Sequence, residues 1–136
     1  MDCLFCSIIA GNIPSNKIYE DNDVFAFLDI GPVSEGHTLI IPKIHAADLQ
    51  SGTEDVASAL MRAVYQLAPA IMKGVNADGY NLGMNHGECA GQEVGHTHLH
   101  LMPRQKGVER TFVKTHPTKE QLVATAEKIK SYLYLK

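Results

Sequence analysis

The sequence predicts an α+β fold: a mainly antiparallel five-stranded sheet, with one long helix, a short N-terminal helix and a C-terminal helix packed on one face. Short β-prone segments gather before residue 42 and again between residues 79 and 102, and a single long amphipathic helix separates the two groups. Strands and helices do not alternate as in a doubly wound parallel sheet. With 136 residues, 45% of them apolar, the chain is long enough for one domain, expected over residues 1–136.

The N-terminal third is expected to form a short helix, a hairpin and a third strand. Asp2 can cap a helix from Cys3 to about Ala10. Residues 17–20 and 24–28 are β-prone and flank a turn-forming Asp-Asn-Asp segment, which predicts a hairpin. Residues 37–41 are apolar enough for a buried strand, which Pro42 should end.

The remaining chain is expected to supply the long helix and two more strands. Apolar residues recur every three or four positions after Thr53, which predicts a helix that ends at Gly74. Residues 79–84 and 96–102 are the last two strand candidates, and Pro103 should close the second.

The last predicted element is a helix that begins at Thr118. Gln121 follows three residues later, which is the spacing of a capping box. The apolar face of this helix consists of Leu122, Ala126, Ile129 and Leu133. A small antiparallel sheet leaves two open edges, and a homodimer could cover them.

Charge and composition narrow the class of protein. The formal net charge of −3 does not favour general binding to nucleic acid, which needs a basic surface. The chain has no apolar run long enough to span a bilayer and no signal-peptide pattern, so we expect no membrane partner and a cytoplasmic location. Three cysteines are too few for a disulfide framework.

The segment from residue 95 to residue 104 contains three alternating histidines. Side chains alternate along a strand, so His96, His98 and His100 should share one face while the intervening apolar residues enter the core. Buried imidazoles need partners, and several together should be partly neutral, as nucleophiles, bases or metal ligands are. A histidine-rich solvent face and a purely metal-binding face are the alternatives.

These histidines match the His-x-His-x-His-x-x signature of the histidine-triad nucleotide hydrolases and transferases, which the chain resembles. Other segments fall where that family's motifs fall: residues 27–30, 36–43 and 91–94, and Asn85. The resemblance implies a histidine-triad fold. It also implies that His98 attacks an α-phosphate and forms a nucleotidyl-histidine, held through its second nitrogen by the carbonyl of His96. His100 and His37 would then contact phosphate oxygens or protonate the leaving group.

The same resemblance implies a substrate class. Asn85 stands where the nucleoside phosphoramidase branch has asparagine, which favours purine nucleoside phosphoramidates over dinucleoside polyphosphates, the enzymatic alternative. Glu93 departs from the family's usual hydroxyl residue, and a carboxylate there would repel phosphate unless it is protonated or turned away. A nucleotide-binding or zinc-stabilised interaction module is the alternative outside enzymes.

The implied nucleotide site draws on two further groups of residues. The expected nucleotide-binding residues are Asn85, Gly91, Gln92, Glu93, Asp29, Ile30, Phe5, Ile8 and Phe27, with Leu39 also against the base. Asp29 would accept hydrogen bonds from the ribose hydroxyls. The apolar members could equally be ordinary core, and Asp29 could be a turn residue.

Cys3 and Cys6 are spaced so that both sulfurs can face one point. A tetrahedral zinc needs two more ligands, and His45 and His96 are candidates. Some bacterial-type histidine-triad proteins carry this Cys, Cys, His, His set and bind structural zinc. A redox pair or two inert thiols are the alternatives.

A basic stretch follows the histidines: Arg104, Lys106, Arg110 and Lys114. Attraction of a polyphosphate is conceivable there, but a solvated face is the expectation. His86 and His116 are expected at the surface.

Overall fold

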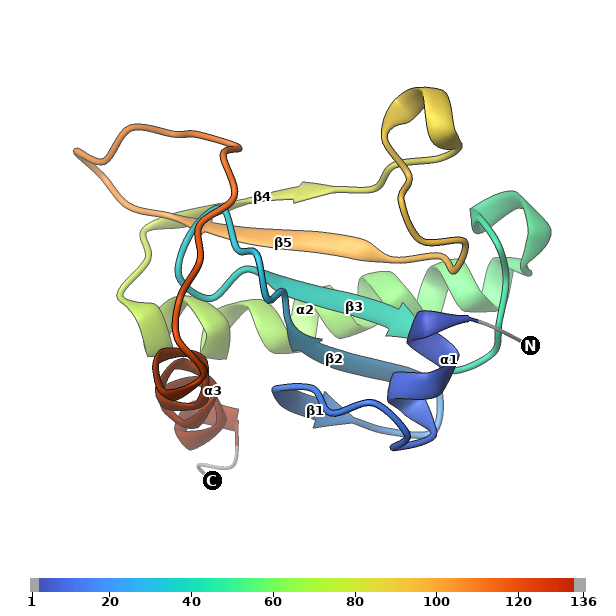
Figure 1. Cartoon of the computed structure of the whole chain (residues 1–136), viewed down its shortest axis with the longest axis horizontal. Coiled ribbons are helices and arrows are strands. Elements are labelled where there is room, and N and C mark those ends of the chain that lie inside the picture. Colours follow the sequence, from blue (N-terminus) through green and yellow to red (C-terminus); the bar gives the residue numbers. More distant parts are fainter. Residues whose placement is uncertain (1–2, 134–136) are drawn as a thin grey trace.

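The structure, a computed structural model, describes residues 3–133 and has one five-stranded antiparallel sheet in the order β1-β2-β3-β5-β4 (Figure 1). The strands are β1 (Lys17–Glu20), β2 (Val24–Leu28), β3 (Thr38–Pro42), β4 (Gly79–Gly83) and β5 (Leu99–Arg104). The helices are α1 (Leu4–Ile9), α2 (Glu54–Val75) and α3 (Lys119–Leu133), with short 3₁₀ turns at Leu49–Ser51 and Glu88–Ala90. The predicted α+β fold is confirmed.

The sheet has a packed core on each face. Ala26, Leu28, Ile40 and Leu101 belong to the larger core, which also contains the buried faces of α2 and α3. The second core lies on the opposite face, against α1; its buried members are Cys3, Phe5, Ile8, Phe25, Phe27, Leu39 and Ile41. The expectation that all the helices share one face is therefore wrong for α1. Every residue of β2 and β3 is buried, so both faces of these central strands need a cover.

The long helix α2 ends later than predicted. It begins after the Thr53 cap as expected, but it continues through Gly74 and ends at Val75, where Asn76 is the C-cap with a φ of 56°. Gly74 is buried against α3: a Cβ there would lie 2.9 Å from the Cα of Ile129. This glycine allows the two helices to approach closely, and the asparagine supplies the left-handed turn that ends α2.

Two strand boundaries also differ from the predictions. β3 includes Pro42 as its last residue, and β5 begins at Leu99 rather than His96 and continues through Pro103. Pro103 is tolerated because β3 pairs with β5 only as far as Leu101, so at Pro103 the only neighbour is β4.

The helix caps follow the sequence closely. In the predicted capping box of α3, Thr118 N–H donates to Gln121 Oε1 at 2.8 Å, and Gln121 N–H donates to Thr118 Oγ1 at 3.1 Å. The predicted cap of α1, Asp2, lies outside the described residues. At the N-cap position Cys3 Sγ accepts a hydrogen bond from Cys6 N–H at 3.4 Å.

Strands β1 and β4 form the edges of the sheet. That a homodimer covers these edges stays a prediction, as does the assignment of residues 1–136 to a single domain. Between residues 3 and 133, no helix combines the length and the apolar character needed to cross a membrane.

Candidate active site and metal centre

Backbone contacts hold the histidine segment that directly precedes β5 in the sequence. Thr97 N–H and Thr97 Oγ1 both donate to the carbonyl of Ala46, at 2.8 and 2.9 Å. His96, Thr97 and His98 therefore lie against the segment that follows β3, while His100 pairs with Leu39 inside the sheet. The alternation predicted for the histidines therefore spans two parts of the chain: His96 and His98 precede β5, and His100 lies within it.

The ring of His98 is oriented by the backbone. Its Nδ1 donates to the carbonyl of His96 at 2.7 Å, which is the contact that the family resemblance implied. Because a carbonyl only accepts, Nδ1 carries the proton and Nε2 keeps a free lone pair. The ring is 7% exposed, and the ring of Phe5 packs edge-on against it with centroids 5.1 Å apart. His98 is thus a fixed imidazole with an unprotonated nitrogen.

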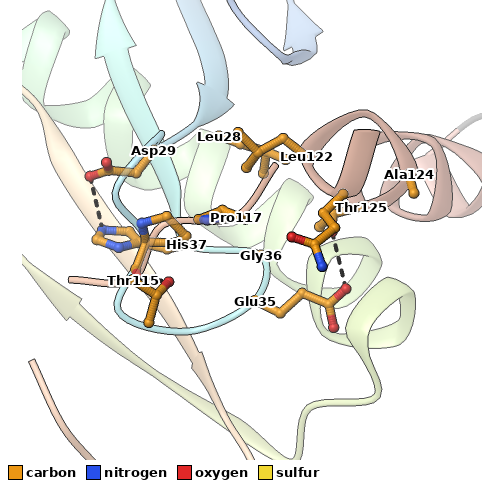
Figure 2. Close-up of a pocket in the computed structure, with 12 residues that line it drawn as sticks. Leu28, Asp29, Glu35, Gly36, His37, Thr115, Pro117, Leu122, Ala124 and Thr125 are labelled. Carbon is orange, nitrogen blue, oxygen red and sulfur yellow. Dashed lines mark hydrogen bonds and ion pairs between the residues drawn. The ribbon is translucent and has the colours of Figure 1, made fainter. Parts of the chain in front are cut away.

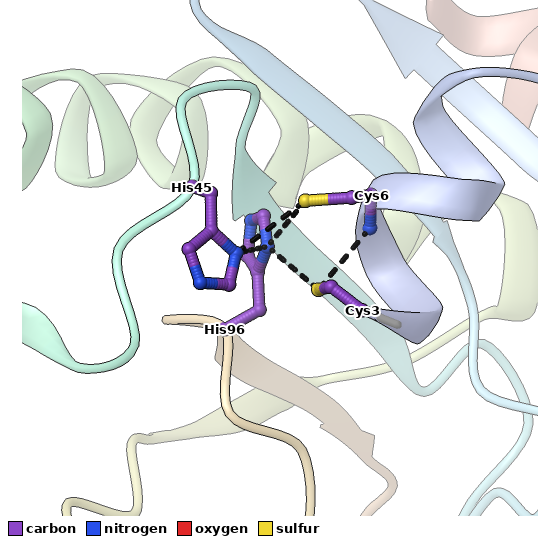
Figure 3. A group of neighbouring side chains, drawn as sticks. All are labelled: Cys3, Cys6, His45 and His96. Atoms are coloured by element: carbon purple, nitrogen blue, oxygen red, sulfur yellow. Dashed lines mark hydrogen bonds between the residues drawn. The ribbon is translucent and has the colours of Figure 1, made fainter. Parts of the chain in front are cut away.

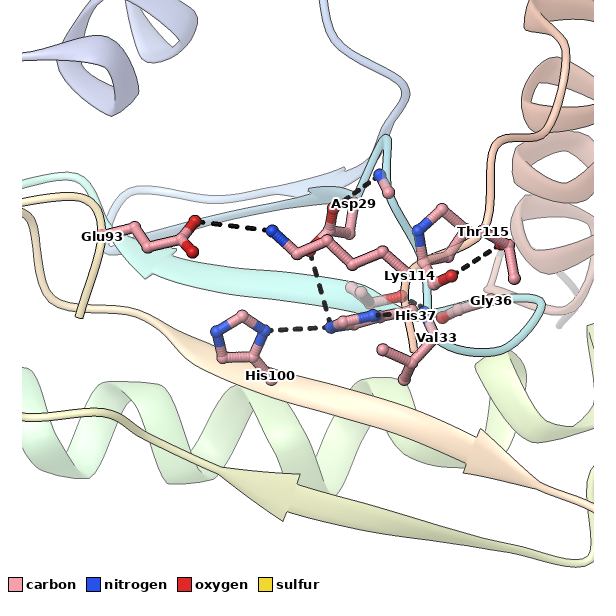
Figure 4. Close-up of polar contacts among 11 residues, drawn as sticks. Asp29, Val33, Gly36, His37, Glu93, His100, Lys114 and Thr115 are labelled. Atoms are coloured by element: carbon pink, nitrogen blue, oxygen red, sulfur yellow. Dashed lines mark hydrogen bonds and ion pairs between the residues drawn. The ribbon is translucent and has the colours of Figure 1, made fainter. Parts of the chain in front are cut away.

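His37 and His100 form a hydrogen-bonded pair beside His98. His37 Nδ1 accepts from Val33 N–H at 3.1 Å, so its proton is on Nε2, which lies 2.9 Å from His100 Nδ1. His37 therefore donates to His100, whose own proton is then on Nε2. The rings of His98 and His100 are 5.0 Å apart between centroids. Asp29 Oδ2 lies 3.7 Å from His37 Nε2 (Figure 4).

Both rings of this pair are neutral at neutral pH. Burial, together with the neighbouring rings of His98 and His37, lowers the pKa of His100 to about 4. Burial also lowers the pKa of His37, although the carboxylate of Asp29 opposes this effect. The pair can therefore donate a hydrogen bond to a phosphate through His100 Nε2–H, but it brings no positive charge.

A cavity of about 350 Å³ adjoins this pair (Figure 2). Residues between Leu28 and His37 line one side of it, and Thr115, Pro117 and the first turns of α3 line the other. Thr125 Oγ1 donates to Glu35 Oε2 at 3.0 Å along one wall. Neither His98 nor His100 lines the cavity, so it lies next to the histidine cluster and not over it.

The residues expected around the base divide into two groups. Phe5, Ile8 and Phe27 are buried in the second core, where Leu39 also packs, whereas Ile30 is 77% exposed. The ring of Phe5 nevertheless reaches the site, since it contacts both His98 and Phe27.

Asp29 has two contacts. Its Oδ1 accepts from Gly31 N–H at 2.8 Å, which is the turn contact weighed above, while its Oδ2 is the atom nearest to His37. One oxygen therefore stabilises the turn and the other faces the histidine pair.

The loop before His96 is held by its own side chains. Gly91 has a φ of 95°, and its carbonyl accepts from Asn85 Nδ2 at 3.3 Å. Gln92 Oε1 accepts from Gly87 N–H, and its Nε2 donates to the carbonyls of Ala47 and Val94. The amide of Gln92 is thus engaged with the loop backbone. Glu93 is exposed and lies 3.5 Å from Lys114 Nζ.

Four side chains converge at the opposite end of the histidine segment (Figure 3). Cys3 Sγ lies 3.4 Å from His96 Nδ1, and Cys6 Sγ lies 3.4 Å from His45 Nδ1 and 3.6 Å from His96 Nδ1. The Nδ1 atoms of His45 and His96 are 3.2 Å apart, and all four candidate ligand atoms lie within 4.8 Å of one another. A tetrahedral zinc with bonds of about 2.0–2.3 Å would place its ligand atoms roughly 3.3–3.8 Å apart. The four predicted ligands therefore fit a zinc ion.

His96 is prepared for this role by the backbone. Its Nε2 donates to the carbonyl of Pro42 at 2.8 Å, so its unprotonated Nδ1 faces the cysteines. Burial lowers the pKa of His96, which keeps the ring neutral as a metal ligand must be.

Several contacts of the site could not be found from the sequence. Val33, Pro42 and Ala46 act through backbone atoms, which carry no residue-type signal. Lys114 belongs to the basic stretch that was expected to be only a solvated face, yet it lies beside the histidine pair. His86 is half exposed, 3.7 Å from Asp48, and His116 is exposed, as expected of surface residues.

Known proteins resemble this chain in sequence and in fold. Residues 10–107 match the HIT domain model. The adenylylsulfatase HINT3 of Arabidopsis thaliana is 43% identical over 105 residues, which is 77% of this chain and 53% of HINT3. The adenosine 5'-monophosphoramidase HNT1 of Saccharomyces cerevisiae is 43% identical over 103 residues, 76% of this chain and 63% of HNT1.

A solved structure extends the likeness over nearly the whole chain. A zinc-bound histidine triad family protein from Mycobacterium smegmatis superposes with a TM-score of 0.83 at 36% identity, covering 97% of this chain and 98% of that one. The chain belongs to the HIT domain family. It spans about half of HINT3 and less than two thirds of HNT1.

Proposed function

We propose that the chain is a nucleotide hydrolase that cleaves purine nucleoside 5'-phosphoramidates at the α-phosphate, with His98 as the nucleophile. The observation that carries this proposal is the 2.7 Å hydrogen bond from His98 Nδ1 to the carbonyl of His96. It leaves the Nε2 lone pair free on a ring that cannot turn, which is what a nucleophilic imidazole requires. The activities in the names of HINT3 and HNT1 support a nucleotide substrate.

The proposed reaction has two steps. His98 Nε2 attacks the α-phosphorus, a bond forms from nitrogen to phosphorus, and the phosphorus–nitrogen bond to the leaving amine breaks. The ring of His100 lies beside that of His98, so its Nε2–H donates a hydrogen bond to a phosphate oxygen. Because His100 is neutral, the leaving amine takes its proton from solvent, and the water that attacks in the second step returns that proton. Water then displaces His98 from phosphorus, which releases a nucleoside monophosphate and restores the neutral ring.

The remaining binding roles follow from position. Asp29 Oδ2 is the carboxylate oxygen closest to the histidine pair and accepts hydrogen bonds from the ribose. Phe5, Phe27 and Ile8 form the apolar floor on the α1 side, and Ile30 is the exposed apolar residue at the rim. Asn85, Gly91, Gln92 and Glu93 shape the loop that borders the phosphate.

Zinc has a structural role in this proposal. Cys3, Cys6, His45 and His96 would hold it, and when bound it supplies a cross-link between α1 and the histidine segment. The zinc-bound relative from Mycobacterium smegmatis supports this assignment. We further propose a homodimer that acts in the cytoplasm, in keeping with three unpaired cysteines.

Replacement of the nucleophile tests the function directly. His98→Ala should lower kcat on adenosine 5'-phosphoramidate by at least about 1,000-fold, because the covalent route is lost. The thermal midpoint of unfolding should stay close to that of the parent protein, which would show that the variant is folded and that the nucleophile alone is lost. His86→Ala, at an exposed histidine, is the matched control and should retain full activity.

Two further measurements separate the alternatives. Rapid quench of the parent protein and a radiolabelled substrate in denaturant at alkaline pH, where the phosphorus–nitrogen bond survives, should trap one nucleotidyl group per active chain. The His98→Ala protein should trap none. A parent rate that His98→Ala leaves unchanged would rule out the nucleophile. Faster turnover of dinucleoside polyphosphates than of phosphoramidates would replace the proposed substrate class.

A further inference from the structure

The pair of His37 and His100 brings no positive charge to the phosphate position beside His98. His37 and His100 are neutral at neutral pH because burial lowers the pKa of each ring. The nearest carboxylate, Asp29, adds negative charge. A phosphoryl group is anionic, and its transfer is accelerated by cations that are already in place around the oxygens. A positive charge must therefore come from outside the histidine triad.

Lys114 is placed to supply this charge. The adjacent Thr115 is bound twice to the carbonyl of Pro32, through its N–H at 2.9 Å and its hydroxyl at 2.7 Å, so the backbone is fixed beside the loop that precedes His37. The side chain of Lys114 then runs over Gly31, where a Cβ would lie 3.5 Å from Lys114 Cδ. In Figure 4 it passes Asp29 on its way from Thr115 to Glu93, on the side where His37 and His100 lie. Its charge lowers the pKa of both rings, after the larger effect of burial.

The ammonium of Lys114 has a weak partner. Its Nζ lies 3.5 Å from Glu93 Oε2, and the two side chains are 61% and 76% exposed. An ion pair as exposed as this contributes little, since water screens it. A phosphate that accepts a charge-assisted hydrogen bond is a better partner for the same ammonium. The carboxylate of Glu93 is itself solvated, so it is tolerated at position 93 without a strong partner.

We propose that Lys114 is a phosphate-binding residue of this site, held by Glu93 in the free protein and transferred to a non-bridging oxygen of the α-phosphate when a nucleotide binds. The inference rests on the proposed function for the position of the phosphate. It adds to the triad a cation that comes from the C-terminal segment of the chain.

The test compares the binding of AMP and adenosine to the full chain by calorimetry at low ionic strength. Lys114→Met keeps the aliphatic contact over Gly31 and should weaken AMP binding by about tenfold or more, because one charge-assisted contact is lost. Adenosine, which has no phosphate, should bind equally to both proteins. Lys114→Arg should restore most of the AMP affinity. Lys73→Met, at an exposed lysine of α2 behind the sheet, should leave both affinities unchanged.

The other outcomes are equally informative. If Lys114→Met leaves AMP affinity unchanged, or weakens the binding of AMP and adenosine equally, Lys114 is not a phosphate ligand. Hydrolysis of adenosine 5'-phosphoramidate by the parent protein would then show that the proposed function still stands. Glu93→Gln should strengthen AMP binding several-fold, because it frees Lys114 and removes a repelling charge; weaker binding would overturn the role of Glu93. A parent protein that binds AMP no better than adenosine would contradict both proposals.

Discussion

Single backbone atoms decide the chemistry of individual histidines in this protein. Carbonyl oxygens of His96 and Pro42 place the protons of His98 and His96, and the N–H of Val33 places that of His37. The proton position of each ring is therefore defined: the lone pair is on Nε2 in His98 and on Nδ1 in His96, whereas His37 uses both nitrogens in hydrogen bonds. These contacts replace the side-chain carboxylates that orient histidines in many other sites.

Burial of neutral histidines predicts a pH-dependent stability. The pKa of His100 is about 4 in the folded protein, below the ordinary value of about 6.5, so between these values the unfolded chain binds more protons. The free energy of unfolding should therefore decrease as the pH falls from about 6.5 to about 4. The contribution of one ring cannot exceed about 1.4 kcal/mol per pH unit.

Urea denaturation at several pH values measures this effect. His100→Asn removes the titration and should make the decrease shallower, even though it shifts the stability at neutral pH. The groups that face this ring, His98, His37, Asp29 and Lys114, remain in both proteins. An unchanged slope would mean that His100 is protonated as readily in the folded as in the unfolded state. His86→Asn serves as the exposed control.

At the scale of secondary-structure elements, the contact between α2 and α3 depends on one missing side chain. Gly74 lies within α2, and a Cβ there would be 2.9 Å from both the Cα and the Cγ1 of Ile129. Ile129 is fully buried in α3, so the helices have no free space to absorb a methyl group.

Gly74→Ala should therefore destabilise the protein by about 1–3 kcal/mol, the usual cost of overpacking, although alanine favours a helix by about 1 kcal/mol in the absence of contacts. The midpoint of urea denaturation measures the change. Gly79→Ala makes the same substitution where a Cβ meets nothing within 4 Å, and it should be nearly neutral by comparison. Equal effects at both positions would show that α3 moves away at no cost.

At the scale of the whole molecule, the candidate metal centre joins three separate parts of the chain. Cys3 and Cys6 come from α1, His45 follows β3, and His96 precedes β5. A bound ion would connect the N-terminal helix to the segment that positions His98. Its effect should therefore reach both stability and activity.

Zinc removal should lower the thermal midpoint by at least about 5 °C, because binding free energy at a structural site contributes to folding. Differential scanning calorimetry with and without a strong chelator measures the shift. Cys6→Ser should reproduce it and lose bound zinc in metal analysis, whereas Cys89→Ser, at an exposed free cysteine, should do neither. Purified reduced protein without metal, and a midpoint insensitive to chelator, would rule out the zinc centre.

Much of the architecture could be predicted because local signals agree with the packing. The strand at residues 24–28 and the capping box at Thr118 were correct in detail. The failures came from tertiary contacts: Gly74 is explained by its neighbour Ile129, and Pro103 by the limited length of β3. The histidines of the candidate site were found by residue type, whereas the position of Lys114 depends on how the segment after β5 returns to the loop at Pro32.

The contacts that unite the site have a consequence for biosynthesis. The pair Cys3 and His96 is separated by 93 positions, and the pair Lys114 and Glu93 forms only when the segment after β5 has folded back. A chain emerging from the ribosome therefore exposes β1, β2 and β3 long before β5 arrives to pair with β3. During that interval the unpaired edge of β3 is open to other chains, and the nascent protein can neither close its cysteine–histidine cluster nor present a complete histidine triad.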